Sequence, residues 1–550
     1  MKKKLFMLLL LFTMLFAAFG CDGNGIINGI TLTKVQVTGK SNISVGDTFV
    51  IDAKITPEGK YENKFTFTSS NEMVIEVNAD GVVVGLAKGA ASVIATSTEN
   101  ENLVGRLYVK VNEKSIEYTD EAPDSLKLIG SNEAYTGTKA YYRFETTPNN
   151  SSQDVKFITS NESIATIDNY GIATFKNSGS VMLTAFSVKN ESVRASITVN
   201  VLESTRNSDY ETQTKEVIKN TKNSILGVAN YTYDSKHKLS GKSFGSGFVY
   251  HVQGILEDGQ LTNDLNDKNI KKYMNYLVTN KHVVEGSDEL KVYIHMIDEE
   301  VPATLIHYDD KVDMAVVKFE YSEYIKPLLF SDSSLVEQGD TVIAIGNPEG
   351  FEYSSSATRG IVSHPERYVS DDTDNDGVKD WDAIYIQHDA SINPGNSGGP
   401  LLDMYGRVIG INTMKFVSNN IDNMGFSIPS NTLIELLPYL EKEKTPVRAK
   451  IGITVAAVID LLQSNYESAD YKYVIPEEIK TGLYITQVTE GSVSAGILQK
   501  DDILLEFNGI VLRKSIQLRA ELGSIIVGSD TIIPVVVYRN GKEVKLNLKF

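Results

Sequence analysis

The chain has 550 residues, of which 41% are hydrophobic and 23% are charged, and its formal net charge is −18. This length predicts about three to five domains of roughly 100–200 residues each. The acidic balance argues against nucleic acid as a general partner, because binding to phosphate backbones requires basic surfaces.

Residues 1–21 have the pattern of a bacterial targeting segment. Three lysines precede an almost wholly apolar run, Leu5–Phe19, which is shorter than the roughly 20 residues that cross a bilayer and is typical of a signal peptide. Its end, Ala18–Cys21, resembles a lipobox. The resemblance implies cleavage before Cys21 and a lipid anchor on it, at the extracytoplasmic face of the bacterial cell membrane. An ordinary secretory signal is the alternative. Cys21 is the only cysteine, so no disulfide is expected.

The next part of the chain is β-rich and repeats itself. Short alternating runs are separated by Gly, Asn and Asp, and the pattern from Phe67 to Ala95 recurs from Phe157 to Ala185, offset by 90 residues at each shared position. Both copies contain a Ser-Asn-Glu turn followed by a β-branched strand. On these residues, segments 28–113 and 123–202 resemble bacterial Ig-like domains of group 2. They are expected to act as a spacer, with adhesion to a glycan or protein ligand as the alternative.

A β-rich segment further on contains a histidine, an aspartate and a serine in an order that suggests acyl transfer. His282 follows a predicted strand, Asp313 precedes another, and Ser397 lies in a Gly-rich turn, with separations of 31 and 84 residues. A serine nucleophile needs a base for its proton and a carboxylate to orient that base. Glycines let backbone N–H groups converge on the developing oxyanion. Alone, His282 and Asp313 would be interpreted as structural, and the Ser397 turn could equally be a Gly/Ser surface turn, but together they predict a catalytic triad.

Short motifs between residues 212 and 440 occur in an order that is typical of one protease family. They are Gly245–Phe248, Thr279–Val284, Asp313–Lys318, Ala344–Pro348, Thr358–Ser363, Asn393–Pro400 and Asn423–Ser430. With them, segment 212–440 resembles the HtrA/DegP-type trypsin-like serine proteases. The resemblance implies two six-stranded β-barrels with the triad in the cleft between them. It implies that Ser397 is the nucleophile, His282 the general base and Asp313 its orienting partner.

The same resemblance implies an oxyanion hole and a substrate pocket. The amides of Gly395 and Ser397, with Asn396 between them, would form the oxyanion hole. The pocket is expected to be lined by Ser391, Ile392, Asn412, Thr413, Met414, Gly425 and Phe426. No acidic residue is evident at its base, so small or medium apolar substrate residues are expected there. This chemistry requires no cofactor.

Two segments depart from the family pattern. Residues 254–272 form a polar insertion, which is expected to be an exposed loop. In the acidic stretch 371–382, Asp372, Asp374, Asp376 and Asp380 fall at positions 1, 3, 5 and 9 of an EF-hand-type calcium loop, with Gly377 at position 6. The usual glutamate at position 12 is Ala383. A solvated acidic turn is therefore the alternative to a calcium site.

The C-terminal part begins with a predicted helix over residues 431–444, which carries regularly spaced leucines. Three motifs follow it, Ile451–Ile453, Gly491–Ile497 and Asp501–Gly509. With them, segment 448–550 resembles a PDZ domain. The resemblance implies that Ile451, Gly452 and Ile453 hold the carboxylate of a C-terminal peptide, which adds to the sheet as a strand.

These observations predict a mainly β protein with two Ig-like β-sandwiches, a chymotrypsin-like double β-barrel and a PDZ domain. The predicted function is that of a lipid-anchored surface serine endopeptidase, which cleaves unfolded or damaged proteins through a Ser-His-Asp acyl-enzyme while its PDZ domain binds client C-termini. The family resemblance also implies protein quality control and a homotrimer, whose contacts the N-terminal domains could alter. The alternatives are a non-enzymatic surface adhesin or scaffold on a protease fold, and a chaperone.

Overall fold

A computed structural model describes residues 26–27, 30–31, 34–56, 62–112, 117–204, 209–234, 238–348, 350–372, 379–413, 424–467, 473–528 and 531–550. The predicted signal peptide and Cys21 lie outside the described residues. Strands dominate the remainder, which confirms the predicted mainly β class. No helix within those ranges has the length and apolar character needed to cross a membrane. The chain divides into two compact units, Met1–Glu113 and Lys114–Phe550.

The first unit is built from short strands with one buried face, which pair antiparallel except for the parallel pair β4–β11. Along β10 (Gly89–Ser97) the buried residues Ala91, Val93 and Ala95 alternate with less buried ones, as expected when successive side chains point to opposite faces. The other strands are β1 (Ile26–Ile27), β2 (Ile30–Thr31), β3 (Lys34–Thr38), β4 (Asn42–Ser44), β5 (Thr48–Val50), β6 (Asp52–Thr56), β7 (Phe65–Ser69), β8 (Ile75–Val77), β9 (Val82–Gly85) and β11 (Val104–Asn112). They pair in the orders β4-β11-β10-β7, β3-β6 and β5-β9-β8.

The second unit opens with strands that repeat this pairing pattern. They are β12 (Ser125–Ile129), β13 (Glu133–Tyr135), β14 (Thr138–Tyr141), β15 (Arg143–Thr147), β16 (Val155–Thr159), β17 (Ala165–Ile167), β18 (Ile172–Phe175), β19 (Gly179–Ser187) and β20 (Arg194–Leu202). Their orders β13-β20-β19-β16, β12-β15 and β17-β18-β14 correspond strand by strand to those of the first unit. The sequence repeat therefore has a counterpart in the topology.

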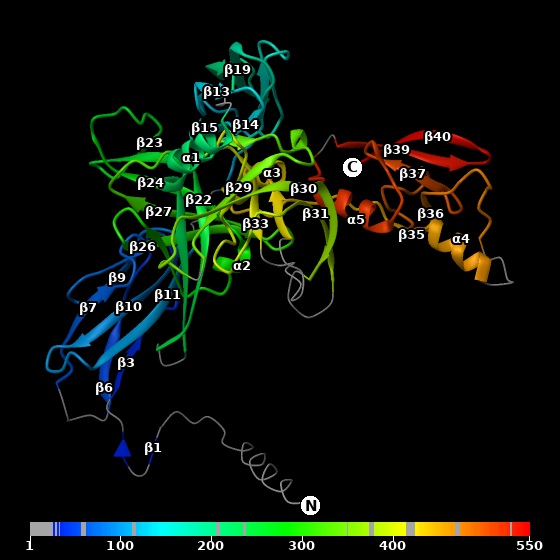
Figure 1. Ribbon diagram of the computed structural model, residues 1–550. Helices are drawn as coiled ribbons and strands as arrows, with labels where there is room; N and C mark the ends of the chain where they lie inside the picture. The colour runs from blue at the N-terminus through cyan, green and yellow to red at the C-terminus, as the bar shows by residue number, and fades with distance from the viewer. Residues whose placement is uncertain are drawn as a thin grey trace, which may run out of the picture. The chain divides into compact units, whose positions relative to one another are not determined.

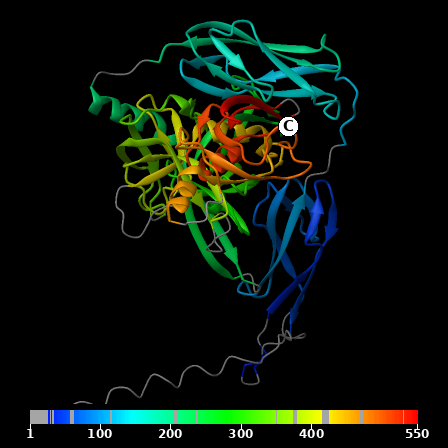
Figure 2. The ribbon, with the colours of Figure 1, turned by 90° about the vertical axis from the view of Figure 1, so that its right-hand side faces the viewer.

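Two closed rings of six strands follow, which confirms the predicted double barrel. The first ring, β21-β25-β26-β27-β24-β22, closes through the β21–β22 pair, and the second, β33-β32-β29-β30-β31-β34, closes through β33–β34 (Figure 1). Their bounds are β21 (Ile225–Tyr233), β22 (Leu239–Leu256), β24 (Ile270–Thr279), β25 (Glu289–Ile294), β26 (Glu299–Asp309) and β27 (Met314–Tyr321), then β29 (Thr341–Gly346), β30 (Ser356–Asp371), β31 (Trp381–His388), β32 (Pro400–Leu402), β33 (Val408–Thr413) and β34 (Gly425–Pro429). Figure 2 shows β21 and β22 projecting beyond the first ring.

Helices and short elements complete the double barrel. These are α1 (Tyr210–Thr221), η1 (Lys222–Ser224), β23 (Leu261–Thr262), α2 (Lys281–Val284), β28 (Phe330–Ser331), η2 (Ser333–Leu335) and α3 (Ser430–Leu440). One hydrophobic core joins both rings and α3, and it includes Phe248, Val316, Ile411 and Leu437. The two barrels therefore meet through packed side chains.

Two local predictions differ from the structure. The insertion at residues 254–272 was expected to be a loop, but β22 continues to Leu256, β23 pairs with it, and β24 begins at Ile270. Backbone pairing extends this hairpin even though its side chains are polar. The helix predicted over 431–444 ends at Leu440, and Glu443 adopts a left-handed φ of 56°, which an α-helix cannot contain.

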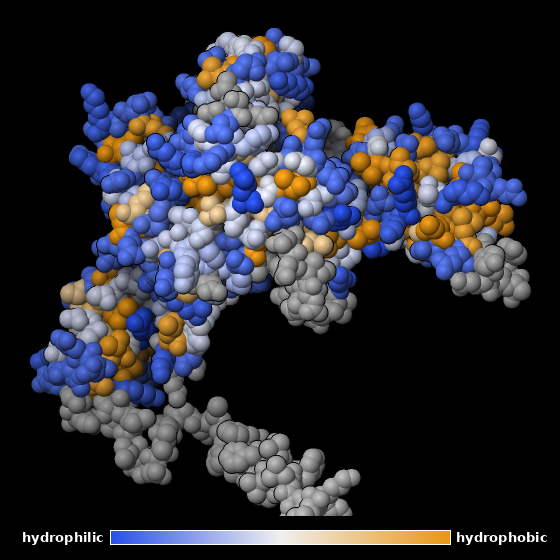
Figure 3. All heavy atoms as spheres, in the orientation of Figure 1, coloured by the Kyte–Doolittle hydropathy of each residue, from blue (hydrophilic) through white to orange (hydrophobic). Residues whose placement is uncertain are grey.

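The C-terminal segment forms a module with its own hydrophobic core. Its elements are β35 (Ile453–Ala457), α4 (Val458–Glu467), β36 (Leu483–Val488), β37 (Ile503–Phe507), β38 (Ile510–Val511), α5 (Ser515–Ser524), β39 (Ile532–Arg539) and β40 (Lys542–Lys549). The sheet order β35-β36-β37-β39-β40 leaves β35 at one edge. Figure 3 shows hydrophobic residues on the visible face of this module, and its exposed apolar side chains include Ile459, Val474 and Ile532.

The repeat domain of the second unit is joined to the double barrel by backbone pairing. Strand β14 pairs with β28, Thr138 opposite Ser331 and Lys139 opposite Phe330, so one sheet runs from this domain into the second barrel. The side chain of Arg407 donates to the carbonyl of Thr136 at 2.9 Å. This domain is therefore more than a spacer, because it also shares a sheet with the second barrel.

A buried ion pair strengthens the same junction. The Nε of Arg143 donates to Glu441 Oε2 at 2.6 Å, a second bond joins the two groups, and Tyr250 donates to Glu441 at 2.8 Å. Their side chains are only 18% and 14% exposed. A charge removed from such a pair leaves its partner buried and uncompensated, which costs about 3–5 kcal/mol.

We predict that Arg143→Ala destabilises the protease domain by about this amount, about 3–5 kcal/mol. The only tryptophan, Trp381, lies on β31 of the second barrel, so its emission during urea unfolding reports that domain. Arg194→Ala is the matched control, because Arg194 lies on an exposed part of the same repeat domain and binds only a local carbonyl. Equal urea midpoints for the two variants would mean that the repeat domain is a free spacer.

Candidate active site

His282 and Asp313 form a hydrogen-bonded pair on the first barrel. The Nδ1 of His282 lies 2.8 Å from Asp313 Oδ2 and 3.1 Å from Oδ1. The backbone N–H of His282 also donates to Oδ1 at 2.9 Å. The aspartate side chain is only 5% exposed, whereas that of the histidine is 35% exposed. This arrangement leaves the imidazole accessible and orients it through a shielded carboxylate, as general-base catalysis requires.

Local backbone geometry holds this pair in place. His282 lies in α2, directly after β24, and Asp313 lies in the turn between β26 and β27. Asp313 has a φ of 60°, which is uncommon for a residue other than glycine. The buried Asn280 donates through Nδ2 to the carbonyl of Asp313 at 2.9 Å. The end of β24 and the aspartate turn are therefore tied together.

Ser397 lies in a tight turn of the second barrel, where it is 4% exposed. The flanking Gly395 and Gly398 have φ values of 98° and 86°. A Cβ atom would lie 2.2 Å from the carbonyl oxygen of Asn347 at the first position and 2.0 Å from that of Ser246 at the second. Only glycine fits there. Among the described residues, the N–H groups of Gly395 and Ser397 have no acceptor, so both are available to an anion.

The described contacts do not include a hydrogen bond between Ser397 and His282. The hydroxyl of Ser397 has no hydrogen-bond partner among the residues that the structure describes. Bonds of this kind are often long without substrate and shorten when substrate binds. A side chain of the second barrel does contact the pair, because Thr413 Oγ1 donates to Asp313 Oδ2 at 3.3 Å.

The predicted substrate-pocket residues fall into three groups. Ser391 and Ile392 precede the serine turn and are exposed and partly buried, respectively. Asn412, Thr413, Gly425 and Phe426 lie on the paired strands β33 and β34, and Met414 lies outside the described residues. Asn412 is fully buried and Phe426 belongs to the hydrophobic core, so these two side chains support the pocket from inside the barrel.

The sequence analysis did not predict a buried series of hydrogen-bonded side chains next to these residues. His388 is fully buried, and its Nε2 lies 3.1 Å from Ser427 Oγ. Ser427 donates to Asn412 at 2.9 Å, and Asn412 donates to the carbonyl of Pro400 at 3.0 Å. Burial lowers the pKa of His388 to about 4. The imidazole is therefore neutral at neutral pH and is a structural part of the barrel end.

The predicted peptide-binding residues lie at the start of β35. Ile451 is buried, and Gly452 has a φ of 69° with a virtual Cβ 2.3 Å from Ser492 Cβ. The carbonyl of Gly452 accepts from the N–H of Thr489 at 2.8 Å. Ile453 opens β35, whose outer edge has no strand partner in the described sheet. An unpaired sheet edge of this kind can accept an additional peptide strand.

Of the predicted calcium ligands, Asp372 and Asp380 are described, whereas Asp374 and Asp376 lie outside the described residues. The carboxylate of Asp380 forms an ion pair with Lys311. No cluster of three or more metal-ligating side chains occurs in the described parts of the chain. A cation bound through Asp380 would therefore compete with Lys311 for this carboxylate.

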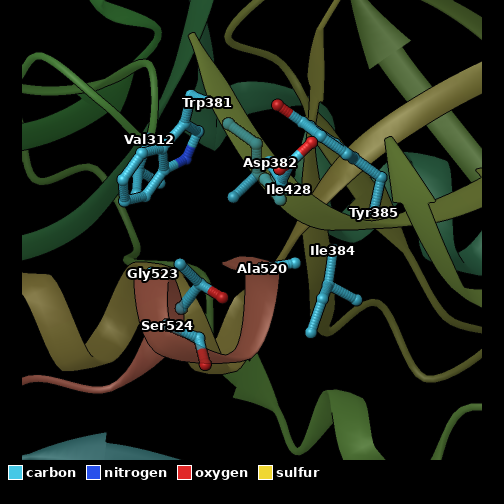
Figure 4. A pocket seen from close by; sticks show the side chains of 11 residues that line it. Val312, Trp381, Asp382, Ile384, Tyr385, Ile428, Ala520, Gly523 and Ser524 are labelled. Atoms are coloured by element: carbon cyan, nitrogen blue, oxygen red, sulfur yellow. The ribbon is translucent and has the colours of Figure 1, made fainter. Parts of the chain in front are cut away.

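The strands beside this acidic stretch contact the C-terminal module. A pocket lies between α5 and β31, with Trp381 on one side and Gly523 and Ser524 on the other (Figure 4). Tyr368 donates to Glu521 at 2.9 Å, and Arg519 bonds to Asp382. β31 ends at His388, nine residues before the candidate nucleophile Ser397, so the module touches a strand that precedes the serine turn in the chain.

Comparisons with known families and proteins show what this chain is similar to. The trypsin-like peptidase domain family matches residues 245–411, which contain all three candidate catalytic residues, and the bacterial Ig-like domain (group 2) family matches residues 30–106. Serine protease Do-like HtrA of Lactobacillus helveticus is 34% identical over 333 residues, covering 60% of this chain and 73% of that protein. Serine protease Do-like HtrA of Bacillus subtilis (strain 168) is 33% identical over 349 residues, covering 62% and 73%. A solved structure, HtrA-type protease AlgW with decapeptide, is 22% identical with a TM-score of 0.42, covering 61% of this chain and 97% of that chain.

Proposed function

The chain belongs to the HtrA family of trypsin-like serine peptidases, and we propose that it is a surface-anchored endopeptidase that cleaves unfolded or damaged proteins. The observation that carries the catalytic part of this proposal is the His282–Asp313 pair, joined at 2.8 Å, on the barrel that faces the Ser397 turn. Protein substrates are supported by the names of the similar proteases, which act on proteins as a class. That the substrates are unfolded or damaged proteins, and that the enzyme is anchored at the cell surface, is part of the proposal and is not indicated by these names.

The proposed reaction uses the site in two acyl-transfer steps. Ser397 Oγ attacks the scissile carbonyl while His282 Nε2 takes the hydroxyl proton, and Asp313 stabilises the imidazolium. The N–H groups of Gly395 and Ser397 bind the oxyanion. His282 then returns the proton to the leaving amine, which leaves an ester on Ser397. Water attacks this ester with His282 again as the base, and the peptide acid and free serine are released.

We predict that Ser397→Ala abolishes cleavage of unfolded casein by the soluble chain of residues 22–550, because no acyl-enzyme can form. Gel analysis of casein incubated with each protein measures this. Binding of casein by the variant should persist. Cleavage that survives in Ser397→Ala would contradict the assignment, and unchanged casein with both proteins would favour the adhesin, scaffold or chaperone alternatives.

We propose that the C-terminal module is a PDZ domain that selects clients by their C-termini. The free edge of β35 and the Ile451–Ile453 loop support this, because such an edge can pair with a peptide strand while loop N–H groups hold its carboxylate. Helix α5 contacts both β35 and the protease strand β31. A bound client would then lie beside an element that reaches the protease domain.

We predict that full-length Ser397→Ala binds an apolar peptide with a free C-terminal carboxylate at least about tenfold more tightly than its amide, as charge-assisted bonds to backbone N–H groups imply. Fluorescence anisotropy measures both affinities. Gly452→Ala should remove the difference in affinity between the acid and the amide, because the new Cβ would clash with the side chain of Ser492. Gly541→Ala is the control, since it has a similar φ of 81° but no neighbour within 4 Å. Equal affinities for acid and amide would exclude this binding mode.

The cellular setting of the proposal rests on the N-terminal sequence. Lipid on Cys21 would anchor the chain at the extracytoplasmic face of the membrane, with the Ig-like domains between the anchor and the peptidase. A homotrimer remains an expectation of the family resemblance, and a glycan or protein ligand for the Ig-like domains remains the alternative to a spacer role. Mass spectrometry of the membrane fraction would test the anchor: an N-terminal peptide that starts at residue 22, or retains residues 1–21, would contradict it.

We propose calcium as an accessory ligand of the acidic stretch 371–382, which the motif spacing supports. We predict that calcium changes the emission of the adjacent Trp381 in a saturable way and that Lys311→Met tightens this response, because Lys311 competes for Asp380. Asp380→Asn should weaken it. If the emission of Trp381 shows no saturable change up to millimolar calcium, the calcium proposal is wrong and the stretch is a solvated acidic turn.

A further inference from the structure

Ser246 lies on the first barrel and is hydrogen-bonded to the serine turn of the second. It is fully buried on β22 between two glycines. A Cβ at Gly245 would lie 2.6 Å from the side chain of Val283, and one at Gly247 would lie 2.3 Å from that of Leu277. Here the strand therefore has room for one small side chain, the hydroxymethyl group of Ser246.

All the hydrogen-bonding capacity of this hydroxyl is used toward the second barrel. Ser246 Oγ donates to the carbonyl of Gly395 at 2.7 Å. It accepts from the backbone N–H of Asn347 at 2.9 Å and from Asn347 Nδ2 at 3.0 Å. A serine hydroxyl has one proton and two lone pairs, so it is fully satisfied at the point where two loops of the second barrel meet.

The backbone of Ser246 joins the two halves of the candidate site. Its N–H donates to the carbonyl of Ser397 at 2.8 Å, and its carbonyl accepts from Thr279 Oγ1 at 2.7 Å. Thr279 ends β24, three residues before His282. The segment that carries the histidine and the turn that carries the serine are therefore both bonded to this one residue.

We propose that Ser246 is a positioning residue that fixes the orientation of the N–H groups that bind the oxyanion. The peptide between Gly395 and Asn396 is held at both ends, because its carbonyl accepts from Ser246 Oγ and its N–H donates to the carbonyl of Asn393 at 3.0 Å. The neighbouring N–H groups of Gly395 and Ser397 are therefore kept in one orientation. Donors that are fixed before the reaction stabilise the transition state without a reorganisation cost.

This role differs from that of a merely structural serine in what it stabilises. A positioning role affects the tetrahedral oxyanion and leaves binding of the uncleaved peptide nearly unchanged. A packing role would affect both equally, or act only on folding. The inference rests on the oxyanion roles given in the proposed function, so wild-type turnover is measured in the same assay.

The test compares Ser246→Ala with Ser430→Ala. Ser430 is equally buried and donates a single bond of 2.7 Å to the carbonyl of Ser331, away from the serine turn. For a peptide p-nitroanilide, Ser246→Ala should lower kcat at least about tenfold, below the 10²–10³ lost when an oxyanion donor is removed, with KM within about twofold. A peptide aldehyde, whose adduct carries the oxyanion, should lose affinity by the same factor as kcat. Ser430→Ala should change neither quantity.

A near-isosteric variant keeps the proposal testable if the alanine variant misfolds. Ser246→Cys has a weaker donor, so its kcat should lie between those of wild type and Ser246→Ala, while the urea transition of Trp381 shows that each protein is folded. Equal effects of Ser246→Ala and Ser430→Ala, or equal losses in aldehyde and substrate affinity, would overturn the positioning role alone. A wild-type protein with no turnover would overturn both this role and the proposed function.

Discussion

The candidate site depends on hydrogen bonds between two separately closed barrels. These bonds fix the orientation of the catalytic residues of one barrel relative to those of the other. The candidate base and its aspartate lie on the first barrel, and the candidate nucleophile lies on the second. Hydrophobic packing joins the barrels, but it is non-directional and does not orient individual atoms. Directed bonds from Ser246 to the serine turn and from Thr413 to Asp313 supply that orientation. Because they are buried, losing either one leaves an unsatisfied group.

The flanking domains are attached to this body by different kinds of contact. The repeat domain of the second unit shares a sheet with the second barrel through β14 and β28, and the Arg143–Glu441 pair adds a buried charge contact. The C-terminal module is instead attached through side chains of α5, with Arg519 and Glu521 bonded to the β30–β31 hairpin. The first junction therefore combines backbone pairing with a buried ion pair, whereas these contacts of α5 are made by side chains.

Much of this architecture could be predicted from local sequence, and the exceptions have physical reasons. The double barrel was expected because the ordered motifs resemble one protease family, and the pairing of His282 with Asp313 was expected from their order and from the need of a general base for an orienting carboxylate. Thr413 was expected in a pocket wall, yet it donates to Asp313, since that contact depends on how the barrels meet. The Arg143–Glu441 pair spans 298 residues and leaves no local pattern. In the insertion at residues 254–272, the strand ends and the short β23 were missed, because polar side chains conceal strands that only backbone pairing defines.

The most direct test of the account is to map the residue that a fluorophosphonate probe modifies in the soluble chain. Mass spectrometry of the digested adduct should find the label on the peptide containing Ser397. His282→Ala should slow labelling by several orders of magnitude, because an alcohol without a base is a weak nucleophile. Label on another serine, or an unchanged rate in His282→Ala, would contradict a Ser397–His282–Asp313 peptidase.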